Sequence, residues 1–245
     1  MRQEPDPALL YPEVAEHGSL AVAIQTLAAA QAIPLAVTAT ASDLLRHATV
    51  PSILPHREPL FVAAWHHERR WWVSGSANNG MLISGVTNDL AQVPAVAHGW
   101  AEGQPLNEIE QSANFELLTG RFDVPDGNLD DVITSEWQYM LKDAENSDSP
   151  GFQALIEAAY TEPTLRRRYP CTSHGALGLF AAPYPFAESF LSVHTAPDGY
   201  TLHKWWWGPA VLKVSTASEA IGAFVDRLRK GLDDRHTVEP DQVDS

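Results

Sequence analysis

The sequence contains one cysteine and few basic residues. With Cys171 alone, the chain can form neither an internal disulfide nor a structural cysteine–zinc site. Its 16 lysines and arginines stand against 31 aspartates and glutamates, which gives a net charge of −15 at pH 7. Because nucleic-acid binding needs patches of lysine and arginine to neutralise phosphates, this balance argues against nucleic acid as a partner. It disfavours an anionic membrane surface for the same reason.

Long apolar runs are also missing. No segment approaches the roughly 18 consecutive apolar residues of a membrane-spanning helix. The N-terminal segment Met-Arg-Gln-Glu-Pro-Asp-Pro lacks the apolar centre of a secretory signal. We therefore expect a cytoplasmic protein with no membrane partner.

Standard cofactor and catalytic motifs are absent. The segment from Gly175 to Gly178 lacks the three-glycine frame of a dinucleotide site, and no phosphate-loop lysine motif occurs. There is no Gly-x-Ser-x-Gly elbow, and the histidines lack the spacing of a zinc site. We expect no cofactor and no metal, although His194 and His203 flank one predicted turn and could face each other.

The first half of the chain predicts strands followed by a helix. Leu60–Trp65 is a continuous apolar run, which is typical of an interior strand buried on both faces. Thr87 is a candidate cap for a helix that carries Leu90 to Trp100, and Pro94 inside it predicts a kink or a broken first turn. Helical patterns follow in the middle of the chain, and Pro163 closes the last of them.

The second half repeats this order. Pro197-Asp-Gly199 predicts a hairpin turn, and Thr216-Ala-Ser-Glu219 is a capping box that opens a final amphipathic helix. The predicted strands are Ala176–Phe180, Ser189–Thr195, Tyr200–Trp206 and Ala210–Val214.

These patterns predict an α+β fold. It consists of two antiparallel sheet units, each followed by an amphipathic helix as in a pseudo-repeat, with a helical middle segment. We expect a flexible arm over residues 1–10 and one domain over 11–232, or two halves over 11–126 and 127–232. Residues 233–245 are acidic and polar, which is typical of a disordered tail.

The candidate site is the polar segment from Ile156 to His174. Its site residues are predicted to be Tyr160, Glu162, Arg167, Tyr169, Ser173 and His174. We expect a short loop over Arg166–Pro170 and a strand entered at Gly175, which would bring these side chains close together. His174 could act as a general acid or base near neutral pH, or could only hydrogen-bond the local backbone.

The Arg166-Arg-Arg168 run has two interpretations. It could hold a carboxylate or phosphate through paired hydrogen bonds, or it could be neutralised by local acids such as Glu157 and Glu162. His56 and Arg57, just before the strand at Leu60, are predicted to approach the same site.

The tryptophans are clustered in sequence. Strand alternation places Trp205 and Trp207 on one face and Trp206 on the other, so one side packs the core and the other could line a pocket for an apolar or cationic group. The pair Trp71-Trp72 is the second such cluster.

Several segments, in order along most of the chain, resemble one family. They include Tyr11–Leu20, Leu82–Leu90, Glu157–Leu165 and Tyr169–His174. They are similar to the uncharacterised actinobacterial family called "natural product biosynthesis protein", domain of unknown function DUF6193. The resemblance implies a place in specialised metabolism but no assigned reaction and no catalytic residues.

We therefore expect a protein of natural-product biosynthesis that binds a small-molecule or peptide intermediate. Cofactor-free acid–base chemistry (elimination, cyclisation or isomerisation) would use His174 as the base and Arg167 or Tyr169 to stabilise charge. The alternatives are a non-catalytic subunit that docks on another biosynthetic protein or its peptide substrate, and an immunity-type binding protein.

Overall fold

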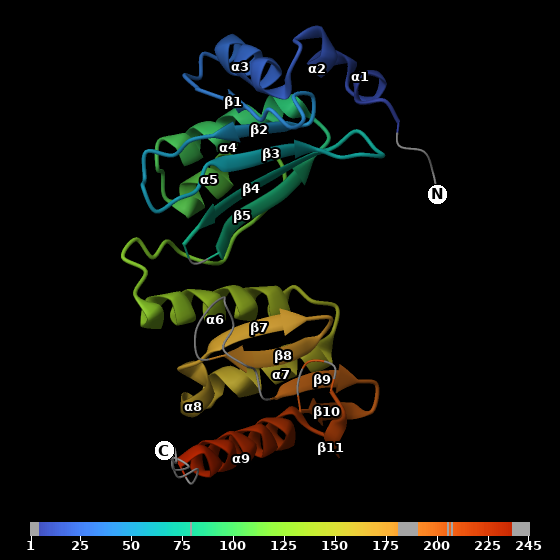
Figure 1. Ribbon diagram of the computed structural model, residues 1–245, viewed down its shortest axis with the longest axis vertical. Coiled ribbons are helices and arrows are strands. Elements are labelled where there is room, and N and C mark those ends of the chain that lie inside the picture. Colours follow the sequence, from blue (N-terminus) through green and yellow to red (C-terminus); the bar gives the residue numbers. More distant parts are fainter. Residues whose placement is uncertain (1–4, 79, 181–190, 205, 207, 237–245) are drawn as a thin grey trace, which may run out of the picture. The chain divides into compact units, whose positions relative to one another are not determined.

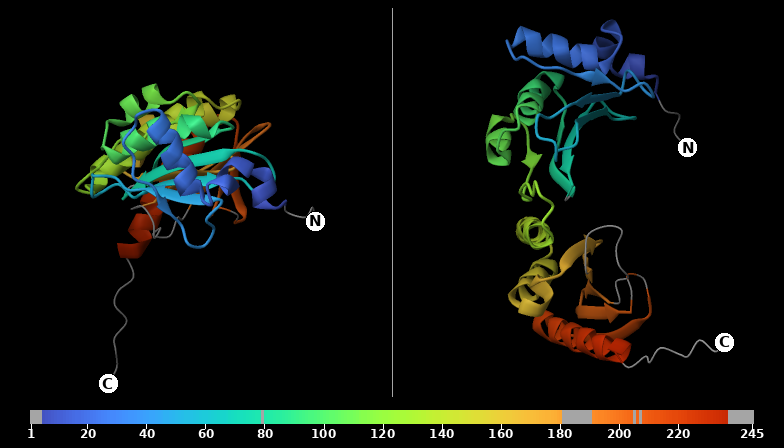
Figure 2. Two further views of the ribbon diagram at one scale, coloured as in Figure 1. Left: turned by 90° about the horizontal axis from the view of Figure 1, so that it is seen from above. Right: turned by 60° about the vertical axis from the view of Figure 1, so that its left-hand side comes forward.

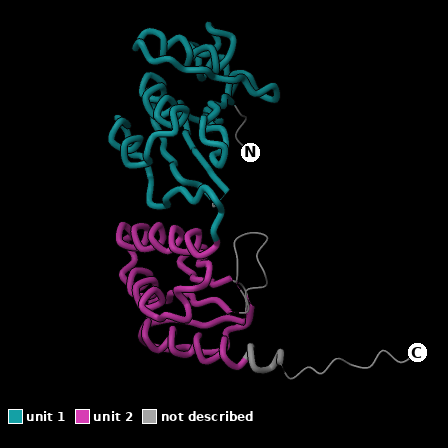
Figure 3. The backbone as a smooth tube through the Cα atoms, turned by 90° about the vertical axis from the view of Figure 1, so that its left-hand side faces the viewer, with its two compact units in different colours: residues 1–128 teal, residues 129–245 magenta. Residues whose placement is uncertain are grey.

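The computed structural model describes residues 5–78, 80–180, 191–204, 206 and 208–236. The chain divides into two compact units, residues 1–128 and 129–245 (Figure 3). Over the described ranges each unit contains one antiparallel sheet, of six strands in the first and five in the second, so the fold is α+β (Figure 1). Within the described residues, no helix is both long and apolar enough to cross a membrane.

The strands of unit 1 follow the chain in order across the sheet, from β1 to β6. They are β1 (Thr38–Ala39), β2 (His47–Val50), β3 (Leu60–Ala64), β4 (Trp71–Ala77), β5 (Gly80–Thr87) and β6 (Leu117–Leu118). The helices are α1 (Pro7–Leu10), α2 (Pro12–Glu16), α3 (Leu20–Ala30), the 3₁₀ helix η1 (Leu90–Gln92), α4 (Val93–Ala101) and α5 (Leu106–Ser112).

One face of the first sheet packs against helices. The Ser19 side chain accepts the N–H of Val22 and starts α3, whose apolar side joins α4 on the sheet (Figures 1 and 2). On the strands, alternate residues such as Leu60, Val62 and Val73 are fully buried against these helices. The other alternate residues form the free face of this sheet.

The predicted start of α4 was wrong in one respect. Asp89, not Thr87, caps this region by accepting the N–H of Ala91. Thr87 is held as the last residue of β5, opposite Trp71, so the helical turn begins further along the chain. The first turn is a separate 3₁₀ turn, and Pro94 lies in the first turn of α4, where its missing N–H costs nothing.

In unit 2, the sheet runs in the order β11, β10, β9, β8, β7. The strands are β7 (Tyr169–Ser173), β8 (Ala176–Phe180), β9 (Ser192–Ala196), β10 (Gly199–His203) and β11 (Ala210–Val214). The helices are α6 (Leu129–Glu145), α7 (Pro150–Thr161), α8 (Pro163–Arg166) and α9 (Ala217–His236).

The local signals of the second half are confirmed. Pro197 and Asp198 form the turn between β9 and β10, and Gly199 follows as the first residue of β10 at a φ of 135°, which favours glycine. The Thr216 hydroxyl accepts the N–H of Glu219, and the Glu219 carboxylate accepts the N–H of Thr216, as a capping box requires. Both apolar runs predicted to be interior strands, β3 and β8, lie inside their sheets.

The predicted loop over Arg166–Pro170 was wrong. Pro163 does not only end α7: Glu162 accepts the N–H of Thr164, and Pro163 then occupies the first turn of the short helix α8. The next strand begins at Tyr169 rather than Gly175, and β7 pairs with β8 through a tight turn at His174-Gly175. The segment expected to form one cluster is therefore divided between a helix and a hairpin.

Candidate functional site

Two of the predicted residues, Tyr160 and Arg167, lie together in unit 2. They line a cavity of about 620 Å³, here called the arginine pocket. Its other lining residues are Asp130, Ile133, Thr134 and Trp137 from α6, and Arg166.

Aromatic contacts organise this pocket. Tyr160 comes from the last turn of α7, and its ring centroid lies 5.8 Å from that of Trp137. Trp137 is fully buried and donates its indole N–H to the carbonyl of Arg168, which joins α6 to the segment between α8 and β7. The Arg166 guanidinium lies 5.6 Å from the centre of the Tyr160 ring, a cation–π distance.

The local acids do not neutralise Arg167. Among the described residues, no carboxylate forms an ion pair with its guanidinium. The Glu157 side chain accepts a hydrogen bond from Gln153, and Glu162 caps α8. Arg167 is exposed and also borders a second depression with Arg168. It can therefore accept an anionic ligand without first breaking a salt bridge.

Tyr169 has a different environment. Its phenol donates to the carboxylate of Glu136 at 3.2 Å, and Glu136 is only 5% exposed. A partly buried hydrogen bond thus joins the first residue of β7 to α6.

Ser173 and His174 line another depression of about 330 Å³, together with Asp143 from α6 and Ser149 at the start of α7. The His174 imidazole Nδ1 lies 2.9 Å from the Ser173 hydroxyl. The backbone of His174 has a φ of 52°, and Gly175 has a φ of 75°, so both residues form the left-handed turn of the β7–β8 hairpin. The structure thus gives His174 a turn-forming role in addition to any chemical one.

His56 and Arg57 belong to unit 1. The Arg57 guanidinium donates to both carboxylate oxygens of Asp123, at 3.0 and 2.6 Å, and the His56 imidazole lies 3.0 Å from the same carboxylate. The Arg57 side chain is 1% exposed and stacks on the Trp100 ring at 4.8 Å. Burial raises the pKa of Asp123, but hydrogen bonds and charges from Arg57 and His56 outweigh it and lower that pKa overall.

His194 and His203 do face each other, with ring centroids 4.3 Å apart. The His194 imidazole is 3.0 Å from the Ser192 hydroxyl, and His203 is 2.8 Å from the carbonyl of Gly208. Burial, and then the charge of His203, lower the pKa of His194. Within the described ranges, no group of three or more potential metal ligands comes together. Trp205 and Trp207 lie outside the described residues.

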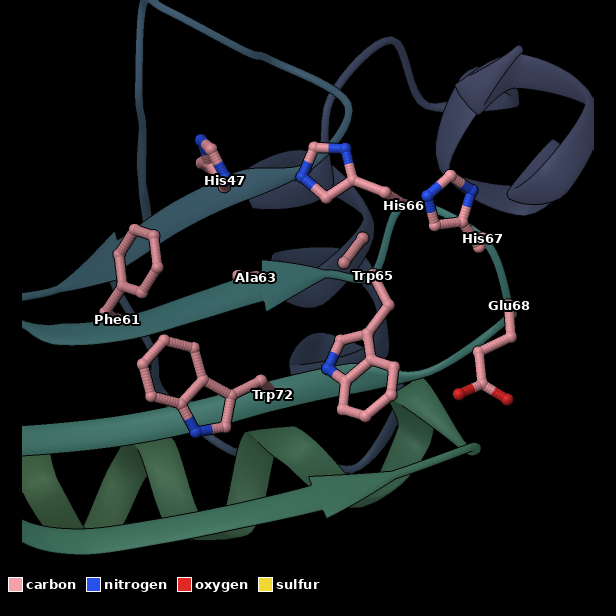
Figure 4. A pocket seen from close by; sticks show the side chains of 9 residues that line it. His47, Phe61, Ala63, Trp65, His66, His67, Glu68 and Trp72 are labelled. Carbon is pink, nitrogen blue, oxygen red and sulfur yellow. The ribbon is translucent and has the colours of Figure 1, made fainter. Parts of the chain in front are cut away.

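Sequence reasoning missed a larger cavity, of about 700 Å³, on the free face of the first sheet. We call it the sheet pocket (Figure 4). Strands supply His47, Phe61, Ala63 and Trp72, and the loop between β3 and β4 supplies Trp65, His66, His67 and Glu68. A signal existed in the sequence, because alternation along β4 places Trp71 in the core and Trp72 on the other face.

A comparison with protein-family models gives one match, and it lies within the second unit. Residues 131–237 match the model of a family of unknown function, DUF6193. This match includes the arginine pocket except for Asp130, and the whole second sheet. No curated protein and no solved structure matches the chain.

Proposed function

We propose that the chain binds a small or peptidic intermediate of natural-product biosynthesis, and that the arginine pocket holds a carboxylate of that intermediate. The observation that carries the proposal is the exposed Arg167 guanidinium, which lines a cavity beside Tyr160 without an ion-pair partner among the described residues. The metabolic context is supported by the resemblance of several sequence segments to the family called "natural product biosynthesis protein".

The chemistry of the pocket suits an organic acid with an apolar or aromatic part. A guanidinium presents a planar fork of donors that matches the two oxygens of a carboxylate. Next to it, Tyr160 and Ile133 offer apolar contact, while the Thr134 hydroxyl donates to the carbonyl of Asp130 at 2.7 Å and can only accept a hydrogen bond from a ligand. A ligand with both a carboxylate and a ring would use the guanidinium and these apolar contacts.

The three residues predicted for catalysis lie in three different environments. Their positions therefore favour a binding function over acid–base catalysis. Arg167 lines the arginine pocket, His174 lines the depression at the β7–β8 turn, and the Tyr169 phenol is engaged by Glu136. Catalysis by His174 with Arg167 or Tyr169 would require them to converge on one substrate atom. That chemistry stays a prediction.

The experiment compares two probes that differ only in charge, N-acetylphenylalanine and its amide, by isothermal titration calorimetry. We expect the acid to bind and the amide to bind more weakly. Because a charge-assisted hydrogen bond contributes about 1.5–3 kcal/mol and Arg167 is exposed, Arg167→Ala should weaken binding of the acid by about tenfold, the lower end of that range.

Arg229→Ala is the matched control, because Arg229 is an exposed arginine on α9 of the same unit and does not line the pocket. It removes the same charge from the chain and should leave the affinity unchanged. The proposal fails if acid and amide bind equally well, or if Arg229→Ala weakens binding as much as Arg167→Ala.

A further inference from the structure

The sheet pocket owes its shape to one row of side chains across three strands. His47 on β2 lies directly opposite Ala63 on β3, and Ala63 lies directly opposite Trp72 on β4. The three therefore share the free face of the sheet, with a small residue between two large rings (Figure 4). The hollow exists because Ala63 leaves unfilled the space that a larger side chain would occupy.

The width of this row suits a flat ring. Neighbouring strands are about 4.8 Å apart, so the backbones of β2 and β4 are separated by about 9–10 Å. A planar group in van der Waals contact on both sides needs about 7 Å, because each contact takes about 3.5 Å. A single ring system could therefore stand above Ala63 between His47 and Trp72.

The rings around the hollow are held in place. The Trp72 indole N–H donates to the Ser84 hydroxyl at 2.9 Å, so its polar edge is satisfied within the sheet. The Phe61 ring meets Trp72 edge to face, with centroids 6.0 Å apart, and lies 5.3 Å from the His47 ring. Such aromatic arrangements are favourable in themselves and present apolar faces to a ligand.

The loop wall is also preorganised. Tyr11, which is fully buried, places its hydroxyl 2.8 to 3.0 Å from the carbonyl oxygens of Trp65, Glu68 and Arg70. Arg69 is fastened to Glu13 by an ion pair. A loop that is ordered before binding loses less entropy when a ligand arrives, as expected of a binding site.

The charged side chains at the rim are engaged with each other and with Trp65, so they do not favour a charged ligand. The Arg70 guanidinium lies 5.3 Å from the Trp65 ring centre, so this aromatic face is already occupied by a cation. Glu68 is 3.4 Å from the same guanidinium, so these two opposite charges are paired with each other and offer little net charge to a charged ligand. The imidazoles of His47 and His67 can each donate and accept hydrogen bonds, which suits a neutral ring with a polar edge.

We propose that the sheet pocket is a second binding site, for a neutral planar aromatic or heteroaromatic group inserted between His47 and Trp72. It is separate from the arginine pocket in unit 2, and neither proposal depends on the other. The ligand could be a free small molecule or an aromatic part of a larger intermediate.

The test uses the full chain and three probes with the same ring but different charge: indole, tryptamine and indole-3-acetate. Binding is followed by saturation-transfer NMR and by shifts of backbone amides in β2 to β4. We expect indole to bind at these strands and both charged probes to bind about tenfold more weakly, because a charged group that enters the pocket loses hydration while the nearby Arg70 and Glu68 are already paired with each other.

Ala63→Leu is the decisive variant, because it fills the hollow and leaves every aromatic side chain in place. It should abolish indole binding. Val86→Leu is its control: Val86 lies opposite Trp72 on β5, on the same face but outside the pocket, and is 38% exposed. It should bind indole normally.

Trp72→Leu is a second variant in case Ala63→Leu does not fold. It should weaken indole binding by about three- to tenfold, as expected when one ring contact is lost. The proposal is overturned if indole does not bind at millimolar concentration, if tryptamine binds more tightly than indole, or if folded Ala63→Leu binds indole like the unaltered chain. The acid and amide probes of the arginine pocket address a different site, so either proposal can fail alone.

Discussion

The two sheets differ in what happens on the face that their helices leave free. In unit 1 this face is open: Val86 is 38% exposed, and Phe61 and Trp72 are half-buried around a cavity. In unit 2 the corresponding face carries Phe180 at 3% exposure and Ser192 at 0%. Both sheets pack helices against one face. Their other faces differ, because this face is exposed to solvent in unit 1 and buried in unit 2.

A tryptophan packed on a strand glycine occurs in both units, but on opposite faces. In unit 1, Trp100 of α4 fills the space above Gly75, where an added Cβ would be 2.6 Å from its ring. In unit 2, Trp206 fills the space above Gly178, where a Cβ would be 2.9 Å away. Trp100 comes from the helical side, while Trp206 covers the side away from the helices. The comparison teaches that the position of one aromatic residue helps decide which face is closed.

The largest expected effect comes from Gly75→Ala. Trp100 is fully buried and its indole N–H donates to the carbonyl of Glu58, so the ring cannot move aside. Overpacking at such a site should lower the free energy of unfolding by about 3 kcal/mol. Gly178→Ala should cost only about 1 kcal/mol, because Trp206 is half-buried and can shift. Urea unfolding, with hydrogen exchange to locate the loss in each unit, measures both. If Gly75→Ala and Gly178→Ala lowered the free energy of unfolding by the same amount, Trp100 and Trp206 would not differ in how firmly they are held.

A smaller effect is expected at the β7–β8 turn. Because His174 has a φ of 52°, His174→Val should lower the free energy of unfolding by about 1–2 kcal/mol. His174→Asn should cost nothing, since Asn-Gly is the favoured pair in such a turn. Thermal unfolding checks this, and binding of N-acetylphenylalanine should be unchanged in both variants. Loss of that binding in stable His174→Asn would instead assign His174 to the ligand site.

The smallest effect is a difference in pH dependence between the units. Because the folded pKa of His194 is lowered below its ordinary 6.5, unfolded chains bind more protons below that pH, and unit 2 should lose stability as the pH falls through this range. Asp123 has a folded pKa below its ordinary 3.8, so its stabilisation of unit 1 is present above pH 3.8 and is lost as the pH falls further. Hydrogen exchange between pH 7 and pH 3 should show unit 2 weakening first. His194→Gln should remove the earlier step, and an unchanged step would assign it to another group.

The candidate site was predicted only in part. Tyr160 and Arg167 were identified from the sequence and do share a cavity, because α7 and α8 are neighbours in the chain. Ser173 and His174 line a different depression, since α8 and the β7–β8 hairpin replace the short loop that would have joined the cluster. His56 and Arg57 are bound by Asp123, a partner 66 residues or more away that no local pattern indicates.

The sequence by itself determined the features that depend on residues within a few positions of one another. The continuous apolar runs of β3 and β8, the Ser19 cap, the Gly199 turn and the Thr216 capping box depend on backbone preferences and on bonds between near neighbours. Tertiary structure alone decided which faces are open and which side chains line a cavity. His47, Ala63 and Trp72 form a binding hollow because strand register places them in one row, and register arises from contacts between residues far apart in the chain.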